Sequence, residues 1–395
     1  MSLRPAPSRR PRLRAVSVLA VCLAALAPAA VSTAADAGPP SPGDSELRQQ
    51  LDRFVRSPGG PPGAIAVLRR GHDQQIVRAG VADLATGRPP RPDDHMRIAS
   101  TAKAFSGAVA LSLVDRGALR LDDTLRRRLP NLPDAWGSVT LRQLLNHTSG
   151  LPDYTESPAF VEELLADPRH RFDSRRLLDY VADEPLRFRP GTRYLYSNSD
   201  NIAVALMAEA VTGTRYERLL RELVYEPLRL RDTSLPSGYQ MPEPYLHGYD
   251  VTPPGPPEDV SEVLSASGVW ASGGIVSTPA DMTRFIRGYA SGALYGKAVV
   301  REQRRWIAGA SEPAGPGRNT AGLAIFRYAT RCGVVLGHTG NFPGYTQLIA
   351  ATPDGSRSLT FSVTTQINRT LAPEKLRQLR DIQENFVCAL LRGGH

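Results

Sequence analysis

The sequence predicts an α+β fold in which an antiparallel sheet is flanked by helices from both ends of the chain. Strand-like segments occur near the start, over residues 64–81, and again near the end, over residues 322–365. The residues between them, 119–262, have mainly helical patterns, and amphipathic helices are expected over residues 45–56 and 373–391. This order of helix, strands, helices, strands and helix is typical of one sheet domain that carries a helical insertion.

The first part of the predicted sheet follows a short amphipathic helix over residues 45–56. Two strands are expected at residues 64–69 and 75–81, because a Pro- and Gly-rich stretch breaks the helix just before them. A helix over residues 101–116 comes next, and Gly117 ends it. Apolar side chains recur at helical spacing in both helices: Leu47, Leu51 and Phe54, then Phe105, Val109 and Leu113.

The middle of the chain is expected to be a mainly helical insertion domain, residues 119–262, within a sheet domain formed by residues 45–118 and 263–395. Helices in the insertion are predicted over residues 140–146, 158–166, 174–182, 199–211 and 215–224. The second part of the sheet domain has predicted strands at residues 322–328, 334–336, 345–352 and 358–365, and a closing helix from about Pro373 to Leu391.

The N-terminus is typical of a secretory signal peptide. Residues 4–14 are rich in arginine, residues 15–31 are almost wholly apolar, and residues 32–37 offer small side chains for cleavage. We therefore expect residues 1–37 to be removed and the mature protein to be secreted without a stable membrane span. The alternative is an uncleaved anchor, which is disfavoured because the apolar run is shorter than the ~20 residues a span needs and Pro28 interrupts it.

The composition is that of a globular protein, with 41% hydrophobic and 22% charged residues. Much of the formal net charge of +9 comes from arginines in the N-terminal segment, and the remaining arginines are scattered among acidic residues. No basic helix with interleaved aromatic residues occurs, so the sequence argues against a nucleic-acid partner.

Two cysteines remain after the signal peptide is removed, because Cys22 leaves with it. In an exported protein, Cys332 and Cys388 are expected to form a disulfide; the alternative is a pair of buried free thiols. Neither His-x-x-x-His nor Cys-x-x-Cys occurs, so no metal site is expected.

A candidate catalytic pair comes from an unusual bias in the basic residues. Only three of the 48 lysines and arginines are lysines, and Lys103 stands one helical turn after Ser100. Arginine keeps its proton at working pH, whereas a buried lysine can release it. A serine hydroxyl needs such a neighbouring base to become a nucleophile. Ser100-x-x-Lys103 therefore predicts a serine whose proton is accepted by Lys103.

Two further triplets complete the pattern. Tyr196-Ser197-Asn198 stands just before a predicted helix, and His338-Thr339-Gly340 stands where one strand ends or the next begins. Each triplet alone is weak, since a cap or a turn would explain it. Their order and spacing relative to Ser100 make the set specific.

With these three motifs, the sequence resembles the serine penicillin-recognising enzymes, which share Ser-x-x-Lys, Tyr-x-Asn and Lys-Thr-Gly or His-Thr-Gly. It is most similar to secreted D-alanyl-D-alanine carboxypeptidases, and also resembles class C β-lactamases and β-lactamase-fold esterases. The likeness covers essentially the whole mature chain, including Leu145-Asn146-His147-Thr148-Ser149-Gly150. It implies a β-lactamase/DD-peptidase-like fold, with no cofactor.

The resemblance also implies roles for individual residues. Ser100 would be the nucleophile, Lys103 and Tyr196 would move its proton, and Asn198 would hydrogen-bond the lysine or the substrate. The backbone N–H groups of Ser100 and Asn341 would form the oxyanion hole, and the strand carrying His338, Thr339, Gly340 and Asn341 would pair with an extended substrate.

One departure from the carboxypeptidase pattern concerns the substrate carboxylate. Relatives that cleave free D-Ala-D-Ala ends use an arginine on the strand before His-Thr-Gly and a threonine directly after it. Phe326 and Asn341 stand at these positions, and the adjacent Arg327 should point to the other face of the sheet. Trp270 either lines the pocket or packs in the core, and His147 is expected to be structural.

The leading hypothesis is an exported serine hydrolase that acts through an acyl-enzyme on a D-Ala-type peptide bond, with a peptidoglycan stem peptide as a possible substrate. The first alternative applies the same machinery to an ester or another amide. The second is a non-catalytic protein that binds peptides or the cell wall, which the three intact motifs disfavour. An α/β-hydrolase is disfavoured because the sequence contains no Gly-x-Ser-x-Gly.

Overall fold

The computed structural model describes residues 42–252 and 255–392. The predicted signal peptide, residues 1–37, lies outside this range, so it stays a prediction. None of the helices in the described part of the chain combines the length and the apolar character that crossing a bilayer requires.

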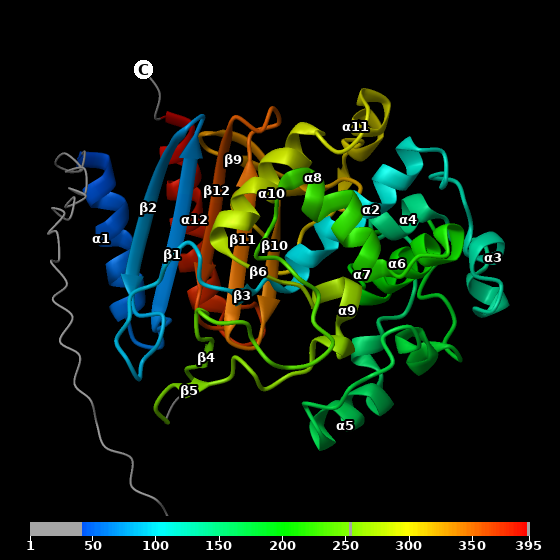
Figure 1. Ribbon diagram of the computed structural model, residues 1–395, viewed down its shortest axis with the longest axis horizontal. Helices are drawn as coiled ribbons and strands as arrows, with labels where there is room; N and C mark the ends of the chain where they lie inside the picture. The colour runs from blue at the N-terminus through cyan, green and yellow to red at the C-terminus, as the bar shows by residue number, and fades with distance from the viewer. Residues whose placement is uncertain (1–41, 253–254, 393–395) are drawn as a thin grey trace, which may run out of the picture. The chain divides into compact units, whose positions relative to one another are not determined.

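The described residues form an eight-stranded sheet (Figure 1). Every neighbouring pair of strands in it is antiparallel. In spatial order the strands are β2 (Asp73–Gly80), β1 (Gly63–Arg70), β12 (Arg357–Val363), β11 (Tyr345–Ala351), β10 (Gly333–Phe342), β9 (Phe326–Thr330), β8 (Arg318–Ala321) and β7 (Ile307–Ala308). The first strands of the chain therefore pair with the last one, and Ala66 lies opposite Phe361. The predicted α+β class with an antiparallel sheet is confirmed.

Side chains that alternate along each strand separate the core into two parts. In β1, Ala66 and Leu68 belong to a core shared with α1 (Pro42–Arg56) and α12 (Pro373–Arg392), which cover one face of the sheet. Ile65 and Val67 point into the larger core on the opposite face. There α10 (Pro279–Ser291) packs on β1, β11 and β12, in front of the strands in Figure 1. Each face of the sheet is thus covered by helices.

Two predicted strand boundaries were wrong, and both errors affect the site. The strand predicted at residues 322–328 is interrupted, because Gly322–Ile325 forms a turn in which Gly322 N–H donates to the Ile325 carbonyl at 2.8 Å. Ala324 in this turn has a φ of +53°, which no strand residue adopts. The strand predicted at 334–336 is much longer, since β10 extends from Gly333 to Phe342 and includes the whole His-Thr-Gly motif.

Mostly helical structure connects the short strands β3 (Met96–Arg97) and β6 (Val276–Ser277), which pair with each other. The α-helices concerned are α2 (Ala102–Asp115), α3 (Leu125–Arg128), α4 (Leu141–Leu145), α5 (Pro158–Ala166), α6 (Asn198–Thr212), α7 (Tyr216–Leu220), α8 (Glu226–Leu228) and α9 (Trp270–Gly273). The helix predicted at 174–182 is a short 3₁₀-helix, Leu177–Val181. A small hairpin of β4 (Tyr249–Asp250) and β5 (Glu258–Asp259) lies within this region, and α11 (Lys297–Gln303) follows α10. The division into two domains stays a prediction.

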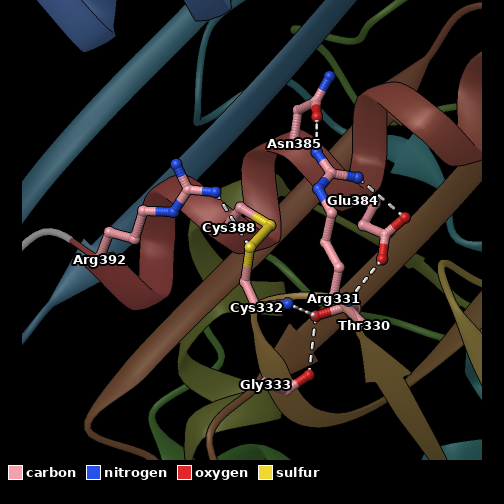
Figure 2. The surroundings of a disulfide bond; sticks show 8 residues. All are labelled: Thr330, Arg331, Cys332, Gly333, Glu384, Asn385, Cys388 and Arg392. Atoms are coloured by element: carbon pink, nitrogen blue, oxygen red, sulfur yellow. Dashed lines mark hydrogen bonds and ion pairs between the residues drawn. A yellow bond between two sulfur atoms is a disulfide. The ribbon is translucent and has the colours of Figure 1, made fainter.

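The predicted disulfide joins Cys332, in the turn between β9 and β10, to Cys388 in α12 (Figure 2). An ion pair of 3.1 Å between Arg331 and Glu384 lies beside it, and the Arg331 N–H also donates to Glu384 at 2.8 Å. The pairing of the two cysteines is confirmed, and the alternative of two free thiols is wrong. The bond ties the strand that carries the third motif to the terminal helix.

Candidate active site

Residues from the first two motifs, and Asn341 directly after the third, meet at one cavity of about 800 Å³, which we call the active-site cavity. Ser100, Tyr196, Asn198 and Asn341 line it. The remaining wall comprises Ala99, Asp153, Thr155, Glu156, Tyr194, Leu195, Val269, Ser272, Gly273, Gly309, Ala310, Glu312, Pro313, Phe342, Asn368, Arg369 and Thr370. Its volume is within the range of small-molecule sites, roughly 300–1,000 Å³.

Ser100 lies on a single 3₁₀ turn, Ala99–Thr101, directly before α2. Ala99 has a φ of +51°, a left-handed conformation that is unfavourable for a residue with a Cβ. The turn leads straight into α2, so Lys103 follows on the same helical face as Ser100. A strained turn therefore presents the Ser100 hydroxyl to the cavity, with the lysine behind it.

Lys103 is fully buried, and its Nζ makes three hydrogen bonds. It donates to Ser100 Oγ at 3.2 Å, to Asn198 Oδ1 at 2.7 Å and to the Ser272 carbonyl at 2.9 Å. Burial lowers the pKa of Lys103 to about 7, although the Asp153 and Asp200 carboxylates oppose the shift. A neutral amine within hydrogen-bond distance of Ser100 is thus available near neutral pH.

Asn198 begins α6 and is held in place by Asp153. The Asn198 backbone N–H and its side-chain Nδ2 both donate to Asp153 Oδ2, at 2.8 and 2.9 Å. Nδ2 also lies 3.2 Å from the Thr155 hydroxyl. With the amide nitrogen fixed in this way, Oδ1 is the atom that faces Lys103. The Tyr-x-Asn motif therefore reaches the lysine through an oriented amide.

The ring of Tyr196 lies beside Lys103, with Nζ 4.9 Å from the ring centroid. Burial raises the pKa of the Tyr196 phenol far above its ordinary value, although the adjacent Ser100 hydroxyl lowers it somewhat. Within residues 42–252 and 255–392, no group makes a well-aligned hydrogen bond to the phenol oxygen. Tyr196 is thus a neutral phenol, next to Ser100, with unused hydrogen-bonding capacity.

His147 contacts Tyr196 and two residues near it in the chain, Leu195 and Asp200. Its ring centroid is 4.4 Å from that of Tyr196, its carbonyl accepts from the Leu195 N–H at 2.9 Å, and its Nδ1 lies 2.8 Å from Asp200 Oδ2. Burial lowers the pKa of His147 to about 3, so the imidazole is neutral. Asp200 belongs to α6, the helix that begins at Asn198. His147 therefore fixes the tyrosine relative to the helix of its own motif.

The His-Thr-Gly motif lies within β10, on the strand edge that approaches Ser100. β10 pairs with β9 only over Gly333–Gly337, so beyond Gly337 no described strand pairs with this edge. Gly340 sits so close to the serine turn that a Cβ would be 2.5 Å from the Ile98 carbonyl oxygen. The absence of a side chain at Gly340 is what allows the strand to lie against the turn.

The side chains of His338 and Thr339 are buried and lie outside the lining of the cavity. His338 Nδ1 donates to the Thr339 carbonyl at 2.6 Å, and burial lowers the pKa of His338 to about 3. The Thr339 hydroxyl donates to the Pro313 carbonyl at 2.6 Å. His338 therefore presents no positive charge to the cavity.

The side chain of Asn341 is hydrogen-bonded to β11 and to the loop after β12. Nδ2 donates to the Thr346 hydroxyl at 3.0 Å and to the Ile367 carbonyl at 2.8 Å, while Oδ1 accepts from Gln366 at 2.9 Å and from Asn368 at 3.1 Å. Phe326, at the other expected carboxylate position, is buried with its ring 5.0 Å from that of His338. Neither residue offers a cation to a substrate carboxylate.

Trp270 lies outside the active-site cavity, and its ring packs elsewhere. It is 2% exposed, its indole N–H donates to Glu217 at 3.0 Å, and its ring is 5.2 Å from that of Tyr216. The contacts with Glu217 and Tyr216 hold the Trp270 side chain against α7. Of the two alternatives for Trp270, packing is the one that the structure has.

Charged groups at the cavity wall include residues that the sequence did not single out. Arg369 lines the cavity with an exposed side chain that has no ion-pair partner within the described part of the chain. Partial burial raises the pKa of Glu312, and the nearby Arg369 opposes this rise. Asp153 and Arg369 were missed because neither lies in one of the three motifs, and folding alone brings them to Ser100.

The model of the family described as Beta-lactamase matches residues 47–384. The chain belongs to the Beta-lactamase family. The predicted kinship with serine penicillin-recognising enzymes, and with it the assignment to serine hydrolases of the β-lactamase fold, is confirmed.

Two curated relatives in this family carry different names. Penicillin-binding protein 4* of Bacillus subtilis is 27% identical over 305 residues, covering 71% of this chain and 63% of its own length. Esterase EstB of Burkholderia gladioli is 37% identical over 183 residues, covering 43% of this chain and 46% of its own length. The chain thus spans about half to two thirds of the length of these family members.

Among solved structures of the β-lactamase fold, a D-stereospecific amidohydrolase from Streptomyces sp. superposes with a TM-score of 0.75 at 29% identity. The superposition covers 89% of this chain and 99% of the amidohydrolase. The family fold thus extends over nearly all of the described residues.

Proposed function

We propose that this protein is an exported serine hydrolase that acts through an acyl-enzyme on amide bonds of D-alanyl-D-alanine type. The observation that carries the proposal is the 3.2 Å contact between the Ser100 hydroxyl and a buried lysine whose pKa is about 7. At that pKa a sizeable fraction of Lys103 is neutral at working pH and can accept the serine proton.

In the first half of the reaction, Ser100 Oγ bonds to the substrate carbonyl carbon while its proton passes to Lys103. The oxyanion would be held by the backbone N–H groups of Ser100 and Asn341. The bond from carbon to the leaving nitrogen then breaks, and the Tyr196 phenol relays the proton from the ammonium of Lys103 to the departing amine. Water, or an acceptor amine, would attack the resulting ester and release Ser100.

The free edge of β10 supports an extended peptide as the substrate. Beyond Gly337 this edge has no strand partner among the described residues, so a peptide could add as a further strand and place its carbonyl at Ser100. Arg369, at the wall of the same cavity, could hold a terminal carboxylate in place of the side chains that Phe326 and Asn341 do not supply.

A second candidate is the same chemistry on an ester or a D-amino acid amide. The similar proteins support this second candidate, because they include an esterase and a D-stereospecific amidohydrolase. The uncharged His338 and the committed side chain of Asn341 favour it too, since both weaken the expected carboxylate site.

Export rests on the predicted signal peptide and on the disulfide. A structural disulfide is stable in an oxidising compartment and uncommon in the cytosol of mesophiles. A protein of this kind outside the cell would meet the stem peptides of peptidoglycan, which we propose as its natural substrate class.

Incubation with a labelled penicillin tests the acyl-enzyme. The wild-type protein should gain one acyl group, and Ser100→Ala should gain none. If neither penicillin nor an activated aryl ester ever acylates the wild type, the hydrolase proposal fails.

Two assays then decide the substrate class: release of D-Ala from a bis-acylated tripeptide ending in D-Ala-D-Ala, and hydrolysis of a short-chain aryl ester. Ester turnover without D-Ala release would favour the second candidate.

A further inference from the structure

A second cavity, of about 600 Å³, lies in the helical part of the molecule and shares no lining residue with the active-site cavity. Its wall comes from residues 171–175, from the start of α7 and the turn after it, from residues 235–237, and from Ser267 and Trp270. We call it the arginine-lined cavity, because Arg171, Arg175, Arg215, Arg218 and Arg221 all line it.

The positive charge of this cavity is only partly neutralised. Asp173 and Glu217 line it, and Glu209 and Glu222 pair with two of its arginines, so four carboxylates stand against five guanidinium groups. An excess of cationic groups around a concave surface attracts anions and weakens as salt screens it.

Two of the arginines are already held by neighbouring carboxylates. Arg175 pairs with Glu209 at 2.6 Å and with Glu217 at 3.1 Å. Arg218 pairs with Glu222 at 2.6 Å, in the geometry of residues four apart on a helix. These pairs orient the guanidinium groups but use much of their hydrogen-bonding capacity.

The guanidinium groups of the other three arginines have unused hydrogen-bonding capacity. Arg215 reaches only as far as 4.0 Å from Glu217. Arg171 and Arg221 are exposed, and neither makes an ion pair or a side-chain hydrogen bond with any residue in the described ranges. These two arginines face one hollow from separate segments of the chain.

The local backbone favours a site at this position. Arg221 begins a five-residue π-helical segment, Arg221–Tyr225, that continues α7. Such π-helical segments are rare in proteins, and those that occur are often found at functional sites. Trp270, whose ring centroid lies 5.0 Å from Arg175 Cζ, and Ser237 also line the cavity.

We propose that the arginine-lined cavity binds an anionic ligand through its phosphate groups. A guanidinium fork matches two oxygens of a phosphate, and the tetrahedral group offers further oxygens to a second arginine from another segment. A carboxylate is planar and serves one fork, so it uses this arrangement less well. The volume of about 600 Å³ is large enough for such a ligand.

Isothermal titration with sodium tripolyphosphate tests this site. We expect the wild-type protein to bind it, the double variant Arg171→Ala/Arg221→Ala to bind it at least tenfold more weakly, and citrate to bind at least tenfold more weakly than tripolyphosphate. The matched control is Arg116→Ala/Arg301→Ala, which removes two exposed arginines that line neither cavity and should leave the affinity unchanged.

Circular dichroism and urea denaturation check that every variant is folded, so the test does not depend on the chemistry of Ser100. The proposal is overturned if the wild type does not bind tripolyphosphate, if the two double variants bind it equally, or if citrate binds as tightly.

Discussion

The acidity of Lys103 results from a balance between burial and two carboxylates. Removing the ammonium from water lowers its pKa, while Asp153 and Asp200 raise it, and the net value is about 7. Because the shift places the titration of Lys103 within the physiological range, we expect its protonation to control whether Ser100 has a base.

This balance predicts the pH dependence of activity. Deprotonated Lys103 is the active form, so kcat/KM for an aryl ester should rise about tenfold per pH unit below pH 7 and level off above it. A pH–rate profile between pH 5 and 9 measures this directly. A profile that is flat across pH 7, or that falls as the pH rises, would show that Lys103 is not the proton acceptor.

His147 is the residue that positions Tyr196. His147→Gln removes the ring that lies 4.4 Å from the tyrosine ring, so we expect kcat to fall by about 10- to 100-fold with little change in KM. The control is His72→Gln, which alters an exposed histidine outside the active-site cavity and should have wild-type kinetics. Equal kcat values for the two variants would remove His147 from the mechanism.

At the scale of elements, the site depends on how closely β10 approaches the turn before α2. Gly340 allows this approach, and Gly340→Ala would place a Cβ 2.5 Å from the Ile98 carbonyl oxygen. The carbonyl oxygen belongs to the backbone and cannot rotate away as a side chain would. The strand must therefore move away from Ser100, and the Asn341 N–H would move with it.

We therefore expect Gly340→Ala to lower the free energy of unfolding by about 1–3 kcal/mol and to slow acylation of Ser100 strongly. Urea denaturation and labelled penicillin measure the two effects. Gly238→Ala is the matched control, since a Cβ there would meet no atom within 4 Å. Wild-type acylation by Gly340→Ala would mean that the close approach is not needed.

Much of the fold could be predicted from local patterns, because the terminal helices and most strands have clear apolar periods. The strand at 322–328 could not, since its interruption depends on Ala324 N–H donating to the Leu145 carbonyl at 2.7 Å, a contact between distant segments. A single sequence contains no local sign of such a contact.

The same limit applies to the site. The contact between Ser100 and Lys103 could be predicted from their spacing of three residues, and that of Asn198 with Lys103 from the Tyr-x-Asn motif. The packing of Trp270 depends on Glu217, which is remote in the sequence, and the buried state of His338 depends on neighbours such as Phe326. Side-chain surroundings of this kind arise only when the sheet and the helices come together.

For the molecule as a whole, the disulfide is a covalent constraint between the turn before β10 and the terminal helix α12. It closes a loop of 56 residues, so replacing both cysteines by alanine should lower the free energy of unfolding by about 4 kcal/mol. Urea denaturation with and without reductant tests this, and the double variant should not respond to reductant. Acylation at 25 °C should persist, because neither cysteine lines the active-site cavity. A loss below about 1 kcal/mol would contradict the expectation.

The helix α9 contributes residues to the walls of both the active-site cavity and the arginine-lined cavity. Trp270, its first residue, lines the arginine-lined cavity, and the carbonyl of Ser272, two residues later, accepts from the Lys103 ammonium at 2.9 Å. Ser272 also lines the active-site cavity, so one helix of four residues borders both hollows. Weakening the Ser272 acceptor would lower the pKa of Lys103, because its ammonium would lose one of three hydrogen bonds.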